Sequence, residues 1–162
     1  MEETGADVDR SSKEGRTPLM WACRNGHLDV ARLLLAAGAD LAAVTKKGVN
    51  CLHWAVWGGS IPMARWLMEC HGLSTEQLSN AGCNAAIWAA AAGRLDMCMW
   101  LRDAGADFEL VNYWGHGVVG KAAWKGKLDL LAWLVVSGML CATMSAADVT
   151  ATFTRMLFYR TC

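Results

Sequence analysis

The chain has 162 residues, of which 54% are hydrophobic, and its 15 basic and 15 acidic residues balance to a formal net charge of zero. This length suffices for one domain with a sizeable core, and the balanced charge gives no general argument for nucleic-acid binding. The polar, acidic first ten residues do not have the composition of a secretory signal.

The stretch from Gly15 to Asp40 predicts a pair of short helices. Thr17 supplies a hydroxyl that can cap a helix, and Pro18 suits the first helical position. We expect one helix over 19–24 and a second over 28–36. The second helix should present one apolar face, made of Val30, Leu33, Leu34 and Leu35. Because neither helix is long enough to be stable alone in water, the unit needs further copies to stack on.

Glycines repeat along the chain in three series, at intervals of 33 or 34 residues. One series precedes each first helix, one separates the two helices of a unit, and one ends each second helix: Gly15, Gly48, Gly82 and Gly115; Gly26, Gly59, Gly93 and Gly126; Gly38, Gly72, Gly105 and Gly138. One extra residue lies between Gly59 and Gly72, which predicts an irregular second helix or exit in the second unit. The agreement of the three series indicates four tandem copies.

The first unit closely resembles an ankyrin repeat, a turn and two helices of about 33 residues that carry a T-P-L-H tetrapeptide. Thr17-Pro18-Leu19 carries the resemblance here, and the second unit keeps Leu52-His53. The resemblance implies an all-α fold, an ankyrin-repeat α-solenoid of helix–turn–helix pairs joined by hairpin-like loops. In that family the histidine braces the turn by hydrogen bonding, so the expected role of His53 is structural. The resemblance divides residues 12–140 into four repeats, at 12–44, 45–78, 79–111 and 112–140.

The two ends of the chain depart from this pattern. Residues 1–11 match the tail of a repeat, because their Gly-Ala-Asp stretch resembles those that end the first and third units. Either the first unit has degenerated to a turn or the chain is part of a longer array, and we favour the second interpretation. Residues 141–162 form a C-terminal extension, in which a capping-box pattern precedes an apolar stripe. A helix over about 146–159 would cover the end of the stack, although a tail foreign to the fold fits the sequence equally well.

The fourth unit departs furthest from the repeat. The expected capping positions of the four first helices all hold accepted N-cap residue types: Thr17, Asn50, Asn84 and Gly117. However, Gly120 inside the fourth of these helices costs about 1 kcal/mol relative to alanine. Lys121 takes the place that tryptophan has in the other three units, and we expect it to snorkel at the end of the stack. This unit should therefore be the loosest.

Six of the nine tryptophans repeat in register, three in the first helices and three in the second: Trp21, Trp54 and Trp88; Trp66, Trp100 and Trp133. Residues that repeat in register on stacked helices form ladders, so we expect these indoles to stack on one another through the core. Each buried indole would then remove about 150–250 Å² from water. The remaining three tryptophans, Trp57, Trp114 and Trp124, lie off the ladders.

The hydrophobic composition raises the question of a membrane span, and the cysteines that of a metal site. Residues 130–147 carry no formal charge, but the glycine series places Gly138 among them, so a buried solenoid helix followed by a loop explains them better. None of the seven cysteines forms a C-x-x-C pair. Cys51 with His53 is the type of neighbouring pair that suggests a metal, yet four convergent ligands are not evident. Reduced thiols of an intracellular protein are the preferred interpretation.

The sequence contains no pattern typical of catalysis. It has no G-x-S-x-G, no phosphate-binding glycine loop and no H-E-x-x-H. Asp29, Asp96 and Asp129 recur at equivalent places near the start of second helices, where they complement the helix dipole rather than forming an acid/base pair. We therefore expect no enzymatic activity, no cofactor and no bound metal.

The resemblance implies that partners bind along one concave side, made of the hairpin tips and the exposed end of each first helix. The candidate binding residues are Arg16, Arg24, Lys46, Lys47, Trp57, Tyr113, Trp114, His116, Trp124 and Lys125. Val49 and Cys83 are expected at the same surface, which is basic at one end, aromatic at the other and lined by small residues between them. Packing of Trp57 and Trp124 against neighbouring hairpins is an alternative that the sequence leaves open.

These observations predict a non-enzymatic protein–protein interaction module. It would act as an intracellular monomer, cytoplasmic with the nucleus left open, and bind a partner protein segment of acidic and apolar character. The alternative is a regulatory or targeting segment of a larger, enzymatic protein. Binding of nucleic acid, with Trp57 as a stacking platform, is disfavoured by the zero net charge and the small number of cations. The cations that would serve it are Arg16, Arg24, Lys46 and Lys47.

Overall fold

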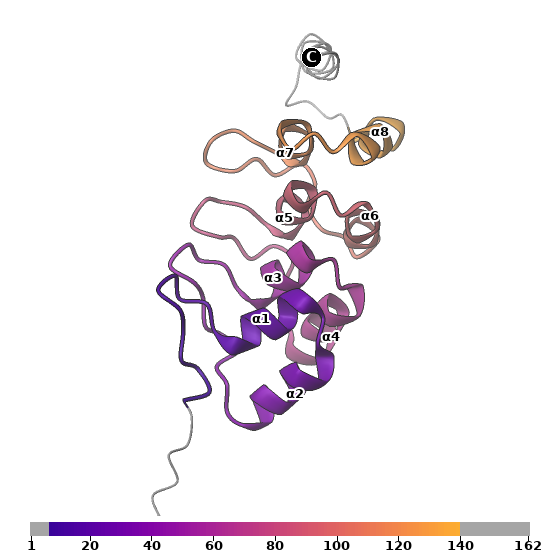
Figure 1. The fold of residues 1–162 in the computed structure, drawn as a ribbon. Coiled ribbons are helices and arrows are strands. Elements are labelled where there is room, and N and C mark those ends of the chain that lie inside the picture. Colours follow the sequence, from indigo (N-terminus) through magenta and orange to yellow (C-terminus); the bar gives the residue numbers. More distant parts are fainter. Residues whose placement is uncertain (1–6, 140–162) are drawn as a thin grey trace, which may run out of the picture.

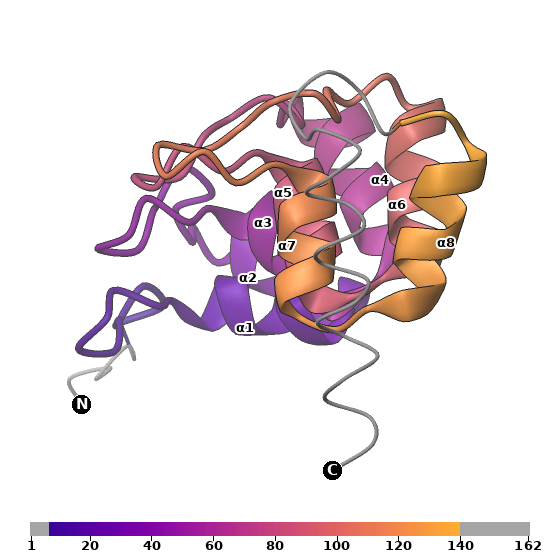
Figure 2. The same cartoon turned by 90° about the horizontal axis from the view of Figure 1, so that it is seen from above.

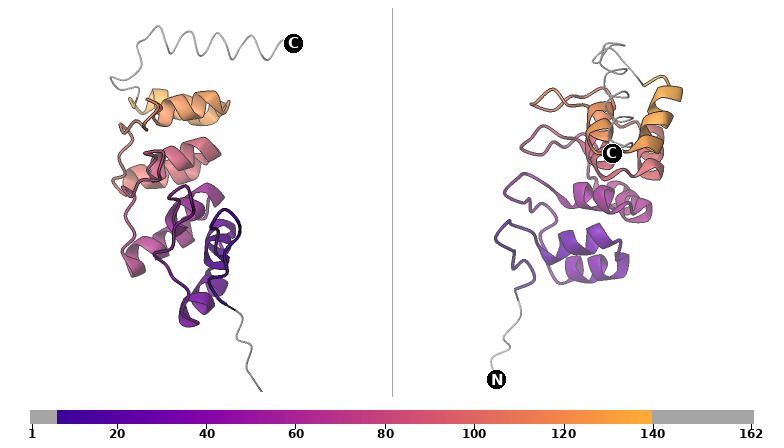
Figure 3. Two further views of the ribbon diagram at one scale, coloured as in Figure 1. Left: turned by 90° about the vertical axis from the view of Figure 1, so that its left-hand side faces the viewer. Right: turned by 45° about the horizontal axis from the view of Figure 1, so that its top comes forward.

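The computed structural model describes residues 7–139, which form eight α-helices and no strand. They make four antiparallel pairs of an inner and an outer helix (Figure 1): α1 (Pro18–Asn25) with α2 (Leu28–Ala36), α3 (Cys51–Gly58) with α4 (Ile61–His71), α5 (Ala85–Ala92) with α6 (Leu95–Asp103), and α7 (Val118–Trp124) with α8 (Leu128–Val136). The pairs stack along one axis (Figure 3), with α1 and α2 at one end and α7 and α8 at the other. The all-α solenoid expected from the sequence is confirmed. The extension over 141–162 and its expected helix lie outside the described residues, as do residues 1–6 of the tail.

Long loops precede the inner helices α1, α3, α5 and α7 and project on one side of the stack (Figure 2). We call these loops the first to the fourth finger, in chain order. Successive fingers are joined by backbone hydrogen bonds at equivalent positions. The amide of Lys46 donates to the carbonyl of Glu14 at 3.1 Å, the amide of Asn80 to that of Lys47 at 2.9 Å, and the amide of Tyr113 to that of Ala81 at 3.2 Å. These bonds fix the register of the fingers.

Local chemistry places the helix ends where the sequence predicts them. The side chains of Thr17, Asn50 and Asn84 accept hydrogen bonds from the third residue of α1, α3 and α5 respectively, and Gly117 caps α7 without a side-chain bond. α2 has the predicted bounds, and α1 is one residue longer at each end than expected. α4 has 11 residues where the other outer helices have nine, which confirms the predicted irregularity of the second unit.

His53 has the structural role that the sequence predicts. Its Nδ1 accepts the backbone amide of Asn50 at 3.3 Å while the Asn50 side chain accepts the amide of His53 at 2.9 Å, a reciprocal capping box. Since Nδ1 accepts, the ring carries its proton on Nε2, which donates to the carbonyl of Gln77 at 3.0 Å. The side chain is 2% exposed, and burial lowers its pKa to about 4. The imidazole is thus held neutral.

The expected burial of the six in-register tryptophans is wrong. Trp21 is 40% exposed, and the other five are half-buried at the margin of the core. The fully buried positions between layers hold smaller side chains, among them Leu19, Leu52, Met63 and Leu67. Five of the indoles pack against this core from its margin.

The expected indole-on-indole stacking occurs only once, between Trp21 and Trp54, whose ring centroids are 6.2 Å apart. On the outer helices arginines take its place. The guanidinium of Arg32 lies 5.9 Å from the ring centre of Trp66, and that of Arg65 lies 5.9 Å from the ring centre of Trp100. A guanidinium fits flat on an indole face and keeps its N–H groups in water, so it covers a half-exposed ring better than a second indole.

The apolar face predicted for α2 is also only partly buried. Val30 is 48% exposed and Leu33 is 70% exposed, while Leu34 is half-buried. The residues equivalent to Val30 in the next two pairs, Met63 and Met97, are 0% and 1% exposed because the preceding pair covers them. α2 has no preceding pair within residues 7–139, which explains the difference.

Candidate interaction surface

The concave surface consists of the fingers and the inner helices that they face (Figure 2). The ten predicted binding residues belong to these elements, and their role in binding stays a prediction: Arg16 in the first finger, Arg24 in α1, Lys46 and Lys47 in the second finger, Trp57 in α3, Tyr113, Trp114 and His116 in the fourth finger, and Trp124 and Lys125 at the end of α7. The structure gathers them into two separate groups. Val49 and Cys83, which we expected at this surface, are only 3% and 7% exposed. Val49 still lines a groove of this surface, whereas the Sγ of Cys83 accepts a hydrogen bond from the side-chain amide of Asn112 at 3.4 Å.

The first group surrounds a groove of about 260 Å³ between the first two fingers and the inner helices, which we call the basic groove. Its cations are Arg16, Arg24 and Lys47, and its one anion is Glu14. Its remaining large side chains are three indoles, those of Trp54, Trp57 and Trp88. Lys46 projects from the same finger but does not line the groove, and no residue of the fourth finger does.

Two arginines of the basic groove stack on the same pair of indoles. The guanidinium carbon of Arg16 lies 5.6 Å from the ring centre of Trp21 and 5.1 Å from that of Trp54. The guanidinium carbon of Arg24 lies 5.3 Å and 5.7 Å from the same two rings. Each contact of this kind contributes about 0.5–1 kcal/mol at an exposed site and more where water is excluded. The two charges are therefore held in place although they repel one another.

The close approach of α1 to α3 makes this stacking possible. A Cβ atom built on Gly58 would collide with the backbone carbonyl oxygen of Arg24, so only glycine allows the end of α1 to pack here. The carbonyl of the neighbouring Trp57 accepts the Nε–H of Arg94 at 3.2 Å. This bond ties the end of α3 to the following helix pair.

Trp57 both packs and lines the groove, so the two roles that the sequence left as alternatives are compatible. Its ring is half-buried and meets the edge of Trp88 with centroids 5.6 Å apart. The indole Nε1 atoms of Trp54 and Trp88 are buried and have no hydrogen-bond acceptor within the described residues. The donors that line the groove are the N–H groups of Arg16, Arg24 and Lys47, and they face the one carboxylate of Glu14.

The second group, at the far end of the concave surface, presents its aromatic rings directly to solvent. Tyr113 is 73% exposed, Trp114 is 67% exposed and Trp124 is 72% exposed. The ammonium groups of Lys121 and Lys125 lie 5.0 and 5.3 Å from the ring centre of Trp124. Lys121 thus extends over an indole, in agreement with the expected snorkelling. His116 packs against the same ring, with centroids 6.2 Å apart.

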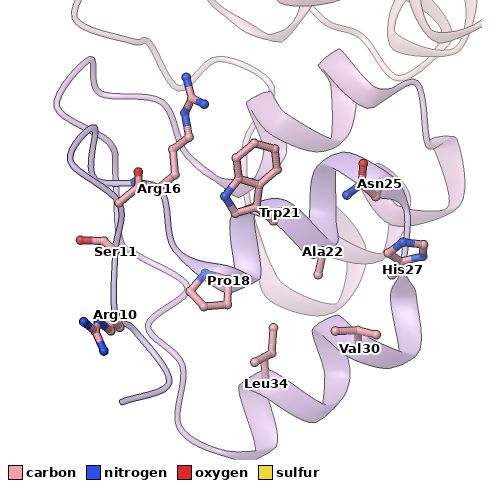
Figure 4. A pocket seen from close by; sticks show the side chains of 11 residues that line it. Arg10, Ser11, Arg16, Pro18, Trp21, Ala22, Asn25, His27, Val30 and Leu34 are labelled. Carbon is pink, nitrogen blue, oxygen red and sulfur yellow. The ribbon is translucent and has the colours of Figure 1, made fainter. Parts of the chain in front are cut away.

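A second hollow, which the sequence analysis did not predict, lies on the end face formed by α1 and α2 (Figure 4). It encloses about 670 Å³, and Trp21, Val30 and Leu34 form its apolar wall beside Arg10 and Arg16. Beside this hollow, the carboxylate of Asp9 accepts the backbone amide of Asp40, in the loop that follows α2, at 2.9 Å. A similar bond recurs along the stack, where the carboxylate of Glu76 accepts the backbone amide of Asp107 at 3.1 Å. The sequence contains no signal for this face, because the exposure of Val30 depends on whether a preceding helix pair covers α2.

The cysteines and acids of the described residues show no reactive arrangement. A hydrogen bond with Cys51 and burial raise the pKa of Cys23, and burial raises the pKa of Cys98 to about 12, so both thiols stay protonated and unreactive. Within residues 7–139, no three histidine, cysteine or acidic side chains are grouped as metal ligands would be. No helix in that part of the chain has the length and apolarity to cross a membrane.

Four stacked helix pairs with hydrogen-bonded fingers define a repeat protein of the α-solenoid class. A family model described as ankyrin repeats, three copies, matches residues 2–78 and again residues 42–112. The chain therefore belongs to the ankyrin-repeat family, which confirms the resemblance seen in the sequence. The search of curated proteins found no match for this chain. Ankyrin repeats are in general protein-interaction modules.

Proposed function

We propose that this chain is a non-enzymatic interaction module, which binds a segment of a partner protein along its concave surface. The observation that carries the proposal is the collection of arginine and tryptophan side chains on that one surface, at both of its ends. These residue types dominate the binding energy of protein interfaces, because tryptophan buries a large area and arginine presents several N–H donors in a planar group.

The packing of the fold also suits this role. The fingers and inner helices form a rigid framework of backbone hydrogen bonds and capped helices, so the side chains on them lose little further freedom when a partner binds. The proposal includes an intracellular, cytoplasmic location, in keeping with free thiols such as Cys23 and Cys51. It also includes a monomeric chain.

The test is a quantitative pull-down with the full chain as bait, comparing the unchanged protein with the double variant Trp57→Ala/Trp124→Ala. The matched control is Arg65→Ala, because Arg65 lies on the outer helix α4 and stacks on Trp100 away from the concave surface. We expect the double variant to lose partner proteins that the control retains. Equal recovery by both folded variants would contradict the proposal.

Circular dichroism and thermal unfolding of each bait exclude loss of folding as the cause. Partners that are recovered are then titrated singly against the same three proteins. A partner whose affinity falls with Arg65→Ala but not with the concave variant would bind the outer side, and it too would contradict the proposal.

A further inference from the structure

We propose that the basic groove binds the carboxylate of an acidic side chain in the partner segment, with a neighbouring apolar side chain of that segment against Trp57. This inference rests on the proposed function and adds the chemistry that the first two fingers select. The juxtaposition that carries it is that of two stacked, unneutralised guanidinium groups with an indole shelf in one groove.

The charges of the groove are unbalanced in favour of an anionic ligand. Arg16, Arg24 and Lys47 face one acid, Glu14. The only ion pair among the described residues joins Arg102 to Asp103 at 3.2 Å, far along the chain from this groove. Although the chain as a whole has no net charge, this groove therefore concentrates positive charge, and an added carboxylate would relieve the repulsion between its cations.

The stacking of the two guanidiniums prepares them to bind a carboxylate. The guanidinium carbons of Arg16 and Arg24 lie 5.1–5.7 Å from the indole ring centres, and the N–H groups of a guanidinium lie in its plane and point outward from its edge. Those edges match the two oxygens of a carboxylate in bidentate geometry. Because Trp21 and Trp54 already hold both side chains, binding requires little additional ordering.

The other wall of the groove is apolar and fits a neighbouring side chain. Trp57 and Trp88 meet edge to face there at 5.6 Å, and both rings are half-buried, so part of each remains available for contact. The buried Nε1–H of Trp88 has no acceptor among residues 7–139. An acidic residue followed by a large apolar one matches this pairing of charge with an indole shelf.

The same observations disfavour nucleic acid as the occupant. A strand needs cations spread along its path, whereas the next positions along the concave surface are occupied by Ala91 and Ala92. A phosphate dianion is also less well suited than a carboxylate, because Glu14 lines the same groove of about 260 Å³ and repels the additional charge. Both ligands are included in the test as competing outcomes.

The experiment is an NMR titration of the full, ¹⁵N-labelled chain, which follows the indole N–H signals of Trp54, Trp57 and Trp88. The four probes are N-acetyl-Glu-Leu-amide, the uncharged N-acetyl-Gln-Leu-amide, N-acetyl-phosphoserine-Leu-amide and single-stranded oligothymidylate. We expect the glutamyl probe to shift these signals and to bind about tenfold more tightly than the glutaminyl probe, as the loss of a charge-assisted hydrogen-bonded pair implies.

Two variants assign this preference to the groove. Arg16→Gln/Arg24→Gln should abolish the preference for the glutamyl probe, so that both probes bind about equally, since neither probe then meets a guanidinium. Arg65→Gln removes an arginine that stacks on an indole in the same way, but on the outer side, and should leave the preference unchanged. Preserved dispersion of the other indole signals shows that each variant is folded.

The outcomes separate the inference from the proposed function. Equal binding of the glutamyl and glutaminyl probes, tighter binding of the phosphoseryl probe or the oligothymidylate, or an equal effect of Arg65→Gln would each overturn the carboxylate site. If partners from the pull-down still depend on Trp57 and Trp124, the concave surface remains the interaction site and only its chemistry at the first two fingers was wrong. If that dependence is also missing, the proposed function fails as well.

Discussion

Trp57 and Trp124 occupy the same position in their helix pairs, yet they stand in different surroundings. The ring of Trp57 is half-buried because Trp88 of the following pair packs against it at 5.6 Å. Trp124 belongs to the last pair of the described residues and is 72% exposed. The comparison teaches that the burial of a repeated side chain is determined by the next layer of the stack, and only secondarily by the helix that carries it.

The cations around the two rings differ in the same way. In the basic groove two planar guanidiniums lie on Trp21 and Trp54 between well-packed helices. At the far end two ammonium groups flank Trp124 on flexible stems. The near end of the concave surface is therefore built as a fixed site, and the far end is open and adaptable.

The largest effect that we expect is a loss of folding stability on acidification, and it originates at the near end of the concave surface. The unfolded chain binds a proton at His53 with a pKa of about 6.5, whereas the buried, folded ring has its pKa lowered to about 4. Stability is therefore fully present above pH 6.5 and is lost as the pH falls towards 4, by about 3 kcal/mol in total. Urea unfolding at pH 7, 5.5 and 4 measures this loss.

The variant His53→Leu provides the control for this pH dependence. It should be less stable at pH 7, because the capping box of α3 is lost, but its stability should vary less between pH 6.5 and 4. The equivalent position in α7 is Gly120, so the far end has no such titrating cap. Equal pH dependence of the two proteins would show that His53 is not the responsible group.

Gly58 and Gly120 test the packing of the two ends directly. A Cβ on Gly58 would collide with the carbonyl oxygen of Arg24, whereas a Cβ on Gly120 meets nothing within 4 Å. Gly58→Ala should lower the free energy of unfolding by about 1–3 kcal/mol, because α1 must move away from α3. Gly120→Ala should raise it by about 0.5–1 kcal/mol through helix propensity. Denaturant midpoints of the two variants measure these changes. An increase in stability with Gly58→Ala would refute the close approach of α1 to α3.

Trp57 and Trp124 can be truncated one at a time. Trp57→Ala should lower stability by about 1–2 kcal/mol, because it removes half-buried area and the contact with Trp88. Trp124→Ala should change stability by less than about 0.5 kcal/mol, as is usual for an exposed side chain. Thermal unfolding of both variants at one pH gives the ratio, and equal losses would mean that Trp124 is buried in solution.

Sequence reasoning was most accurate where chemistry within a few residues decides the structure. Thr17, Asn50 and Asn84 cap their helices because a side-chain oxygen reaches an amide three residues on. The extra residue in α4 followed from the spacing of glycines alone. The family resemblance then selected the ten candidate residues, whose role in binding stays a prediction.

What could not be predicted depends on contacts between units. The sequence shows that Trp21 and Trp54 are equivalent, but not that two arginines from different elements, Arg16 and Arg24, cover both rings. Nor does it show that Val30 remains exposed while the equivalent Met63 is buried, because this depends on whether a preceding pair covers the helix. The basic groove was missed as a unit for the same reason, although all three of its cations were among the candidates.

The smallest change in stability is expected when one kind of cation replaces the other at each end. Arg24→Lys replaces a planar group that contacts two rings at 5.3 and 5.7 Å by a compact, strongly hydrated ammonium. We expect a loss of about 0.5 kcal/mol, the scale of one exposed cation–π contact. Lys125→Arg at the far end should change stability by less, because Trp124 is open to solvent and accepts either cation. Paired urea titrations measure the difference between the two losses of stability. The stacked pair Trp21–Trp54 contributes to near-ultraviolet circular dichroism, so only Arg24→Lys should alter that spectrum. A spectral change with Lys125→Arg alone would reverse the assignment of the fixed and the adaptable end.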